Sequence, residues 1–423
     1  MSISIENLRK IRGMSLDELR VRSRQGAAKL RDRLRRARAP EMSDAELARE
    51  FHPVWRDGTG EEAADMLRCR MRARSRCFLP SLRRRGKIVE MMNRRFPAER
   101  DAIINTADSA LRGKFSLLGH GALSFGDPPF SPIDWRLDPV SGKRAPVLHW
   151  SKLQALNPLG VGDPKVVWEL NRHAHFVTLG QAYWLTNDSR FAAGFVDQVS
   201  DWIDANPTGM GINWASSLEV AFRTISWLWA TQMLVDSLEI TPDFFARLLK
   251  SLIEHGRHIE TYLSYYFSPN THLTGEALGL FYLGLALPEI NRAEGWRKIG
   301  LQILLDQATI QARSDGVYFE QSSYYHRYTT DFYTHLFALT RANNGMIHCE
   351  TEAMVRRKLE AMLDHLMWIT RPDGTSPLFG DDDGGRQIKL AARAANDFRD
   401  TLAVGAAVLE RGGWKYVARA APA

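Results

Sequence analysis

The chain has 423 residues and a formal net charge of +7, with 44% hydrophobic and 25% charged side chains. These proportions are typical of globular proteins and exclude a chain that is disordered throughout. The length exceeds what one hydrophobic core usually serves, so two cores or one extended array of helices are expected.

The motifs of several common sites are missing from the sequence. The three cysteines, Cys69, Cys77 and Cys349, have neither metal-ligand nor disulfide-framework spacing. No HExxH, GxSxG or phosphate-binding glycine loop occurs. We therefore expect neither a metal nor another cofactor.

Arginine is concentrated in two stretches, residues 29–38 and 68–95. This charge favours nucleic acid, anionic lipid or acidic polysaccharide as a partner, although a solvated face on N-terminal helices is the favoured explanation. No nucleic-acid-binding motif accompanies the arginines, so a nucleic acid partner is not expected. No signal peptide or membrane-length apolar segment occurs, which favours the cytoplasm, or the periplasm or exterior if the N-terminus is incomplete. The pattern carries no signal for an oligomeric state.

Residues 1–112 have helical periodicity and many charges, and they predict a basic helical lead-in. Residues 113–165 are rich in glycine and proline, so helices are not expected there. Five aromatic side chains in this part need burial, which predicts an ordered connection: Phe115, Phe125, Phe130, Trp135 and Trp150.

Residues 166–371 predict successive long helices separated by short polar turns. The expected helices are 166–185, 192–205, 214–236, 242–267, 273–287, 292–314, 325–343 and 352–370. Antiparallel helix pairs without a strict repeat favour a closed ring over a regular solenoid. The fold class is therefore mainly α, and the ring is an α/α toroid.

Two segments combine the side chains that β-elimination from a uronic acid requires. The C5 proton of that sugar becomes acidic only when a donor neutralises the carboxylate, and the reaction also needs a base near C5 and an acid for O4. The first segment, residues 268–276, holds Asn270 and His272 at a helix start, where free N–H groups favour an anion. Asn270 is the candidate carboxylate donor and His272 an assistant or second base. Alternatively, Asn270 or Thr271 only caps the helix and His272 packs against its neighbours.

The second segment, residues 315–328, holds Tyr324, Tyr325, His326 and Arg327 beside a further tyrosine. Arg327 or another cation could lower the pKa of a tyrosine, whose usual value is about 10. Tyr325 is then the candidate base and acid, with Tyr324, His326 and Arg327 as substrate contacts. An aromatic helix face in the toroid core is the alternative interpretation.

Two further segments offer substrate contacts, and each has an equally good structural explanation. Their candidates are Trp168, Asn171, Arg172, Asn213, Trp214 and Arg223. The i,i+4 pairs Glu169–His173 and Glu219–Arg223 are expected to interact within their helices. The acidic residues 381–383 could attract a hard cation, but consecutive aspartates cannot all face one ion, so an acidic turn is favoured.

The order of these segments resembles the heparinase II/III family. The matching motifs are Ile133-Asp134-Trp135 with Asp138-Pro139 and Ser141-Gly142, residues 168–173, Asn213-Trp214 with residues 219–223, Asn270-Thr271-His272, residues 320–328 and residues 379–385. The resemblance implies an incomplete α/α toroid followed by an antiparallel β-sandwich, with the active-site cleft between them. It places the carboxylate donor at Asn270 or His272 and the acid, often also the base, at Tyr325, with Tyr324 as the adjacent alternative.

The resemblance also implies a sandwich that begins near Arg371 and contributes a histidine. Residues 372–423 would then be the start of a truncated sandwich, so this domain is expected to be absent or incomplete. The resulting hypothesis is a lyase for an anionic polysaccharide that carries uronic acid, of heparin, heparan, alginate or bacterial exopolysaccharide type. A non-catalytic polysaccharide-binding or assembly protein and a toroid glycoside hydrolase are the alternatives.

Overall fold

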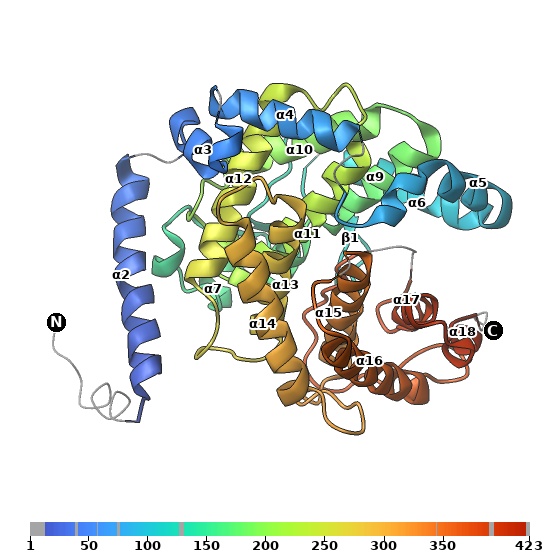
Figure 1. Cartoon of the computed structure of the whole chain (residues 1–423). Coiled ribbons are helices and arrows are strands. Elements are labelled where there is room, and N and C mark those ends of the chain that lie inside the picture. Colours follow the sequence, from blue (N-terminus) through green and yellow to red (C-terminus); the bar gives the residue numbers. More distant parts are fainter. Residues whose placement is uncertain are drawn as a thin grey trace.

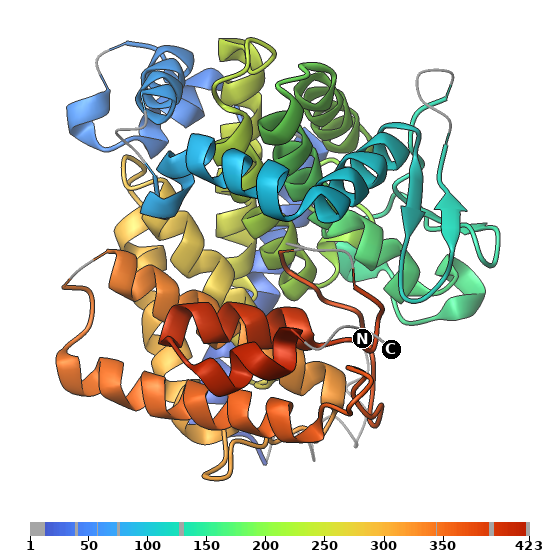
Figure 2. The same ribbon diagram turned by 90° about the vertical axis from the view of Figure 1, so that its right-hand side faces the viewer.

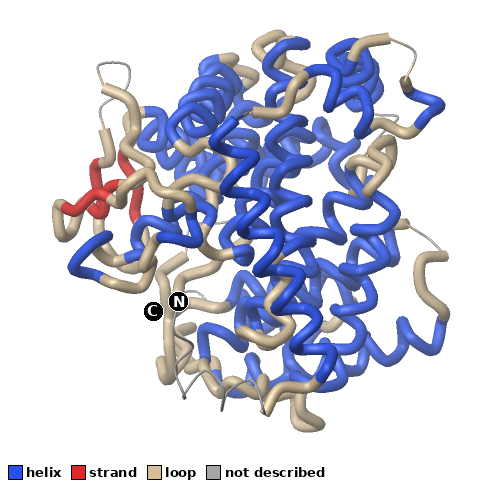
Figure 3. Tube along the Cα trace, turned by 90° about the vertical axis from the view of Figure 1, so that its left-hand side faces the viewer, coloured by secondary structure: helices blue, strands red, loops and turns tan. Residues whose placement is uncertain are grey.

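The computed structural model describes residues 13–38, 41–56, 58–73, 77–126, 131–343, 345–388 and 393–419. Phe130 lies outside these residues. Helices dominate the described chain (Figure 1), and none of them is long and apolar enough to cross a membrane. The strands form two short hairpins on one side of the helical body, coloured red in Figure 3.

The lead-in consists of short helices that pack on the outside of the main body. They are α2 (Leu16–Arg38), α3 (Asp44–Glu50), α4 (Gly60–Arg72), α5 (Arg85–Arg95) and α6 (Pro97–Leu111), with 3-10 turns at Pro53–Trp55 and Pro80–Arg84. Capping boxes start α3 at Ser43 and α4 at Thr59, because each hydroxyl and the glutamate three residues later satisfy each other's backbone N–H groups. Helix α4 packs on α12, and α6 packs on α9.

The described part of the connection that follows comprises residues 113–126 and 131–165 and contains two short hairpins. Strand β1 (Lys114–Ser116) pairs antiparallel with β2 (Ala122–Ser124), and β3 (Leu137–Asp138) pairs with β4 (Lys143–Arg144). The 3-10 turn Trp150–Lys152 and the short helix α7 (Pro158–Val161) complete it. Phe115, Phe125 and Trp135 are buried, and these side chains join the connection to the main core.

The main body is a curved double layer of helices. Its members are α8 (Pro164–Asn171), α9 (Ala174–Thr186), α10 (Arg190–Ala205), α11 (Ser217–Leu234), α12 (Pro242–Thr261), α13 (Thr271–Ala286), α14 (Ala293–Gln311), α15 (Ser323–Ala342) and α16 (Cys349–Ile369), with a 3-10 turn at Ile212–Trp214. Helices α9, α11, α13 and α15 contact one another in sequence as an inner row, and α10, α12, α14 and α16 form the outer row. This is the predicted incomplete α/α toroid.

The expected helix 166–185 is split into α8 and α9. His173 adopts a left-handed conformation with φ of 55°, which ends one helix and allows the next to start in a new direction. The other expected helices agree with the observed ones, apart from shifts at their ends.

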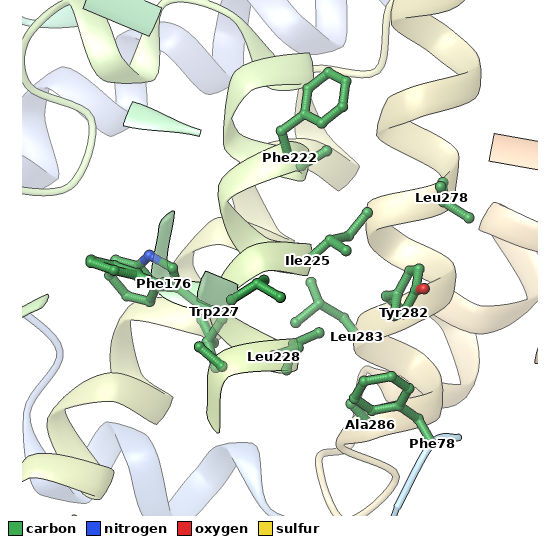
Figure 4. Packing of buried hydrophobic residues seen from close by; sticks show 14 of the residues in the cluster. Phe78, Phe176, Phe222, Ile225, Trp227, Leu228, Leu278, Tyr282, Leu283 and Ala286 are labelled. Atoms are coloured by element: carbon green, nitrogen blue, oxygen red, sulfur yellow. The ribbon is translucent and has the colours of Figure 1, made fainter. Parts of the chain in front are cut away.

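Helices α11 and α13 form the centre of the core (Figure 4). Every residue of α11 except Trp229 is buried. The two helices come close because α13 has a glycine at the contact: a Cβ atom on Gly279 would lie 2.7 Å from the Cβ of Ala221. This contact sets the starts of the two helices side by side.

The described C-terminal residues agree with the expectation that the β-sandwich is absent or incomplete, and they form helices where the start of a sandwich is expected. Within the described residues 372–388 and 393–419 there is no strand; the chain forms α17 (Arg399–Leu409) and α18 (Gly412–Arg419). Figure 2 shows both helices beside α15 and α16. The buried side chains of Leu402, Ala406 and Leu409 recur at helical spacing, so one face of α17 closes over α15 and α16.

Candidate active site

The inner helices begin at the same end of the toroid, and polar contacts join these starts. Arg172, just before α9, pairs with Glu219 in the first turn of α11. Asn270 is the N-cap of α13 and donates to Glu320, which lies just before α15. Side chains from four helix starts therefore meet in one cluster.

Asn270 uses the two ends of its amide for different tasks. Its oxygen accepts a hydrogen bond from the backbone N–H of His272 at 3.1 Å and so caps α13. Its nitrogen donates to the Oε1 atom of Glu320 at 2.7 Å. An amide nitrogen carries two hydrogens, so the predicted cap and the predicted donor are compatible roles.

Tyr325 lies in the first turn of α15, and its hydroxyl donates to Asp383 at 2.6 Å and to Asp381 at 3.2 Å. Burial and the hydrogen bond to the Asp383 carboxylate raise the pKa of the Tyr325 phenol far above its usual value. The expected phenolate is therefore corrected to a protonated phenol. Arg327 acts to lower the pKa of the neighbouring Tyr324 and not that of Tyr325, and its guanidinium binds Asp331 and the carbonyl of Gly384, each at 2.9 Å.

His272 lies near the carboxylates of Glu219, Asp383 and Glu320 and is half-buried. Burial lowers the pKa of its imidazole, although the carboxylates of Glu219, Asp383 and Glu320 act to raise it. The imidazole is therefore neutral near pH 7 and has a nitrogen that can accept a proton.

The acidic loop, defined as residues 379–385, closes over this cluster. The hydroxyl of Ser322 donates to the carbonyl of Asp381 at 2.6 Å. The backbone N–H of Gly385 donates to Glu169 at 3.2 Å, and Arg172 donates to the carbonyl of Asp383. These bonds fasten the loop to the starts of α15 and α9.

Asp381 and Asp383 share two partners, Lys165 and the hydroxyl of Tyr325, whereas Asp382 accepts a hydrogen bond from the backbone N–H of Gly384 within the loop. Lys165, at the start of α8, lies 2.8 Å from Asp381 and 2.7 Å from Asp383. Burial works against the charge of Lys165, but the two carboxylates raise its pKa above the usual value. Across the described chain, no three or more His, Cys, Asp or Glu side chains are grouped to hold a metal ion.

Arg172 is a buried cation with its own pair of carboxylates. Glu219 binds the guanidinium at two points, 2.6 and 2.9 Å, and Glu169 binds it at 2.6 Å. Burial alone would lower the pKa of Arg172, but Glu219 and Glu169 raise it well above the usual value. Both glutamates pair with Arg172 rather than with their expected i,i+4 partners, so we assign this arginine a positioning role instead of a substrate contact.

Every predicted substrate contact except Trp168 is buried, and five of these side chains have their partners in the core: Asn171, Asn213, Trp214, Arg223 and His326. The amide of Asn171 donates to the carbonyl of Trp135 at 2.8 Å and accepts from the Trp202 ring at 2.7 Å. The guanidinium of Arg223 lies 4.2 Å from the centre of the Trp202 ring. Because these side chains are enclosed, we correct their assignment from ligand binding to support of the core.

The side chains of Asn213, Trp214 and His326 also form hydrogen bonds within the core. The indole N–H of Trp214 donates to the carbonyl of Asn206 at 3.2 Å, and the amide of Asn213 donates to the Asn206 side chain at 2.8 Å. The Nε2 atom of His326 is 2.9 Å from the carbonyl of Met362.

Tyr324 and Trp168 lie at the edge of the cluster. Burial and Asp382 raise the pKa of Tyr324, so the two adjacent tyrosines face different aspartates of the acidic loop. Tyr324 lines a cavity of about 590 Å³ together with Glu169, Arg327, Asp382 and Gly384. The half-buried ring of Trp168 donates to the carbonyl of Ile212 at 3.1 Å.

Sequence reasoning missed three members of the cluster: Lys165, Glu320 and Asp383. Glu320 and Asp383 belong to recognised motifs, but their choice of partner depends on contacts across 50 and 58 positions. Lys165 gives no signal of its own, because a lysine near a helix start is usually solvated.

The fold and this cluster define an α/α-toroid protein with an amide, a phenol and an imidazole gathered at its helix starts. The heparinase II/III N-terminus family matches residues 61–402, and the chain belongs to this family.

Curated relatives include the heparin-sulfate lyase of Bacteroides stercoris, 28% identical over 242 residues, which are 52% of this chain and 35% of that protein. The heparin-sulfate lyase of Pedobacter heparinus is 27% identical over 281 residues, 65% of this chain and 38% of that protein. The chain thus spans less than two fifths of the length of these relatives.

Solved structures agree with the fold. A heparan sulfate lyase of Pedobacter heparinus has a TM-score of 0.54 and 24% identity, covering 85% of this chain and 51% of that one. Heparinase III has a TM-score of 0.59 and 19% identity, covering 90% of this chain and 53% of that one.

Proposed function

We propose that the protein is a polysaccharide lyase that cleaves a uronic-acid-containing polymer by β-elimination. The observation that supports the proposal is that Asn270, His272 and Tyr325 share acidic neighbours, Glu320 for the first two and Asp383 for the last two. The family and the names of the curated relatives support the same class of reaction.

The protonation state and free hydrogen-bonding atoms of each side chain suit it to one step of the reaction. Asn270 donates its second amide hydrogen to the uronate carboxylate and makes the C5 proton more acidic. Neutral His272 takes that proton, and the electrons of the C5–H bond form the C4–C5 double bond as the C4–O4 bond breaks. Protonated Tyr325 gives its proton to the departing O4 and recovers one from solvent.

The acidic loop must yield when substrate binds. In the free protein, Asp383 accepts the hydrogen bond that Tyr325 would give to O4. Lys165 balances the charges of Asp381 and Asp383, which limits repulsion of an anionic sugar. The heparin-type polymers named for the relatives are the first substrates to test; alginate and bacterial exopolysaccharide offer the same uronate chemistry.

A non-catalytic polysaccharide-binding or assembly protein is the second candidate. The observation in its favour is that Asn270 and Tyr325 are both hydrogen-bonded to carboxylates of the chain itself. A toroid glycoside hydrolase is the third, favoured by Glu320 and Asp383, whose carboxylates both act on His272.

The product distinguishes the three candidates. We expect the intact chain, given a panel of uronate polymers, to release fragments with the ultraviolet absorbance of an unsaturated uronyl end. Reducing sugar without that absorbance would replace the proposal with hydrolysis. Binding without any cleavage would replace it with the non-catalytic function.

A further inference from the structure

Helix α2 precedes the residues that match the family, yet it is attached to the loop that leads into the site. The family match starts at residue 61, whereas α2 covers Leu16–Arg38. In Figure 1 the helix lies along the outer edge of the molecule, and Figure 3 views that side. Its Arg22 donates to the carbonyl of Tyr266 at 3.0 Å, and Gln25 donates to that of Leu263 at 3.0 Å.

The far end of α2 is held as well. Arg33 donates to the hydroxyl of Ser151 at 2.7 Å, and the ammonium group of Lys29 lies 5.2 Å from the centre of the Trp150 ring. The helix is therefore docked along its length rather than projecting freely.

The docked helix carries an excess of positive charge. Between Leu16 and Leu34 it has six basic and three acidic side chains, and Arg20, Arg24 and Arg31 are exposed. Burial and the neighbouring cations Arg33 and Arg22 lower the pKa of Lys29. Lys29 belongs to the docked side of the helix, whereas the exposed Arg20, Arg24 and Arg31 share its outer side.

The loop under α2 adds exposed aromatic rings next to the site. Tyr265 and Tyr266 are 39% and 37% exposed, and Phe267 is 81% exposed. Asn270 is four positions after Tyr266, so at most about 14 Å of chain joins the helix contact to the carboxylate donor. Aromatic rings offer apolar faces to sugar rings, while arginines pair with carboxylate or sulfate groups.

We propose that the basic face of α2 and the aromatic residues 265–267 form an outlying binding surface for an acidic polysaccharide. This surface holds sugar units beyond those at Asn270 and Tyr325, so it deepens the proposed function and rests on it for the identity of the polymer. The leucines exposed on α2 are Leu16, Leu30 and Leu34, a small apolar face for a helix of 23 residues. That face is too small to anchor the helix in lipid, which favours the polymer over a membrane surface.

The test replaces Arg20, Arg24 and Arg31 with glutamate in the full chain. Its charge-matched control replaces Lys87, Arg94 and Arg95, three exposed cations on α5 at the opposite edge of the molecule in Figure 1. Affinity for long heparin and for a heparin tetrasaccharide is measured at several salt concentrations. We expect the α2 variant to lose affinity for long heparin about tenfold at low salt, since each exposed ion pair contributes below about 1 kcal/mol.

The control should bind long heparin like the parent, and the tetrasaccharide should lose less affinity than the long polymer in the α2 variant. The Phe267→Ala variant should weaken binding without changing its salt dependence, because the lost contact is uncharged. Equal affinities of the α2 variant and the control for long heparin would overturn the inference. If the α2 variant lost binding to phosphatidylserine-containing vesicles but kept its affinity for long heparin, the inference would also be overturned, in favour of a lipid surface.

These binding results do not depend on turnover. If the α2 variant and its control bind alike while the parent still makes unsaturated product, the inference fails and the lyase stands. If no polymer is cleaved but the α2 variant binds long heparin less well than its control, the binding surface stands and the lyase fails.

Discussion

The amide oxygen of Asn270 accepts a hydrogen bond from the first turn of α13, and its amide nitrogen donates one to Glu320. A capping residue needs only an acceptor, which leaves its donor end for another partner. The presence of asparagine at a helix start is therefore compatible with both interpretations of the sequence. The structure separates them by assigning one end of the amide to each.

The Asn270→Asp variant separates these two tasks. Aspartate keeps the oxygen that caps α13, but its carboxylate would repel Glu320 in place of the present hydrogen bond, so the melting temperature should fall while the protein still folds. The new carboxylate would lie beside Glu320 and repel a uronate, so product formation should fall about a hundredfold or more. Thermal unfolding and initial rates on the same preparation check both parts. A variant that kept its rate would show that Asn270 does not bind the carboxylate.

A buried carboxyl group next to the site makes stability depend on pH. Glu276 accepts hydrogen bonds from the N–H and hydroxyl of Ser264 at 2.8 and 2.7 Å, and burial raises its pKa from 4.5 to about 8. Between these two values the folded state binds more protons than the unfolded state. The group therefore lowers stability as pH rises, by about 1.4 kcal/mol per unit at most.

The Glu276→Gln variant should remove this loss. We expect it to match the parent near pH 5 and to unfold at a higher temperature than the parent at pH 9. Melting curves over that range provide the measurement. An unchanged pH dependence would mean that Glu276 is ionised in the folded protein.

At the scale of helices, most of the array follows from sequence periodicity, whereas its interruptions do not. Apolar spacing predicts the inner and outer helices between residues 190 and 370 within a few positions. The break at His173 has no such signal, because it depends on one left-handed residue enclosed by the Trp202 and Trp227 rings. Residues 399–419 form two helices whose apolar spacing is too short to predict them from sequence. Their apolar faces are buried against α15 and α16.

In the predicted site, too, the sequence indicates local features but not the contacts between distant segments. The types and order of Asn270, His272 and Tyr325 indicate the chemistry from sequence alone. The bonds of Glu219 to Arg172 and of Asp383 to Tyr325 join distant segments, so no local pattern predicts them. The protonated state of Tyr325 therefore follows from its contact with Asp383 and not from the sequence.

The contact between α11 and α13 can be tested with one matched pair of substitutions. In Gly279→Ala the new methyl group would meet Ala221 at 2.7 Å, whereas nothing lies within 4 Å of a Cβ atom at Gly295. Alanine favours helix at both positions by up to about 1 kcal/mol. Overpacking costs typically 1–3 kcal/mol, so Gly279→Ala should be destabilising and Gly295→Ala neutral or stabilising. Chemical denaturation measures both, and equal effects would contradict the tight contact.

For the whole molecule, the main result is that the proposed catalytic groups all lie within the toroid and its acidic loop. The structural matches cover 85–90% of this chain but only about half of the solved relatives. The family resemblance nevertheless implied a histidine from a sandwich domain. His272 offers an imidazole from the toroid itself, next to the amide and the phenol.

The central claim is that Tyr325 gives the proton to the leaving oxygen, and the Tyr325→Phe variant tests it most directly. The Tyr333→Phe variant is the control, because the buried Tyr333 hydroxyl has no hydrogen-bond partner among the described residues. Formation of unsaturated uronyl product is measured for both, together with affinity for the polymer. We predict that Tyr325→Phe lowers product formation at least about a hundredfold with affinity retained, while the control keeps its rate. Product formation at the parent rate by Tyr325→Phe, or its loss in Tyr324→Phe alone, would contradict the account.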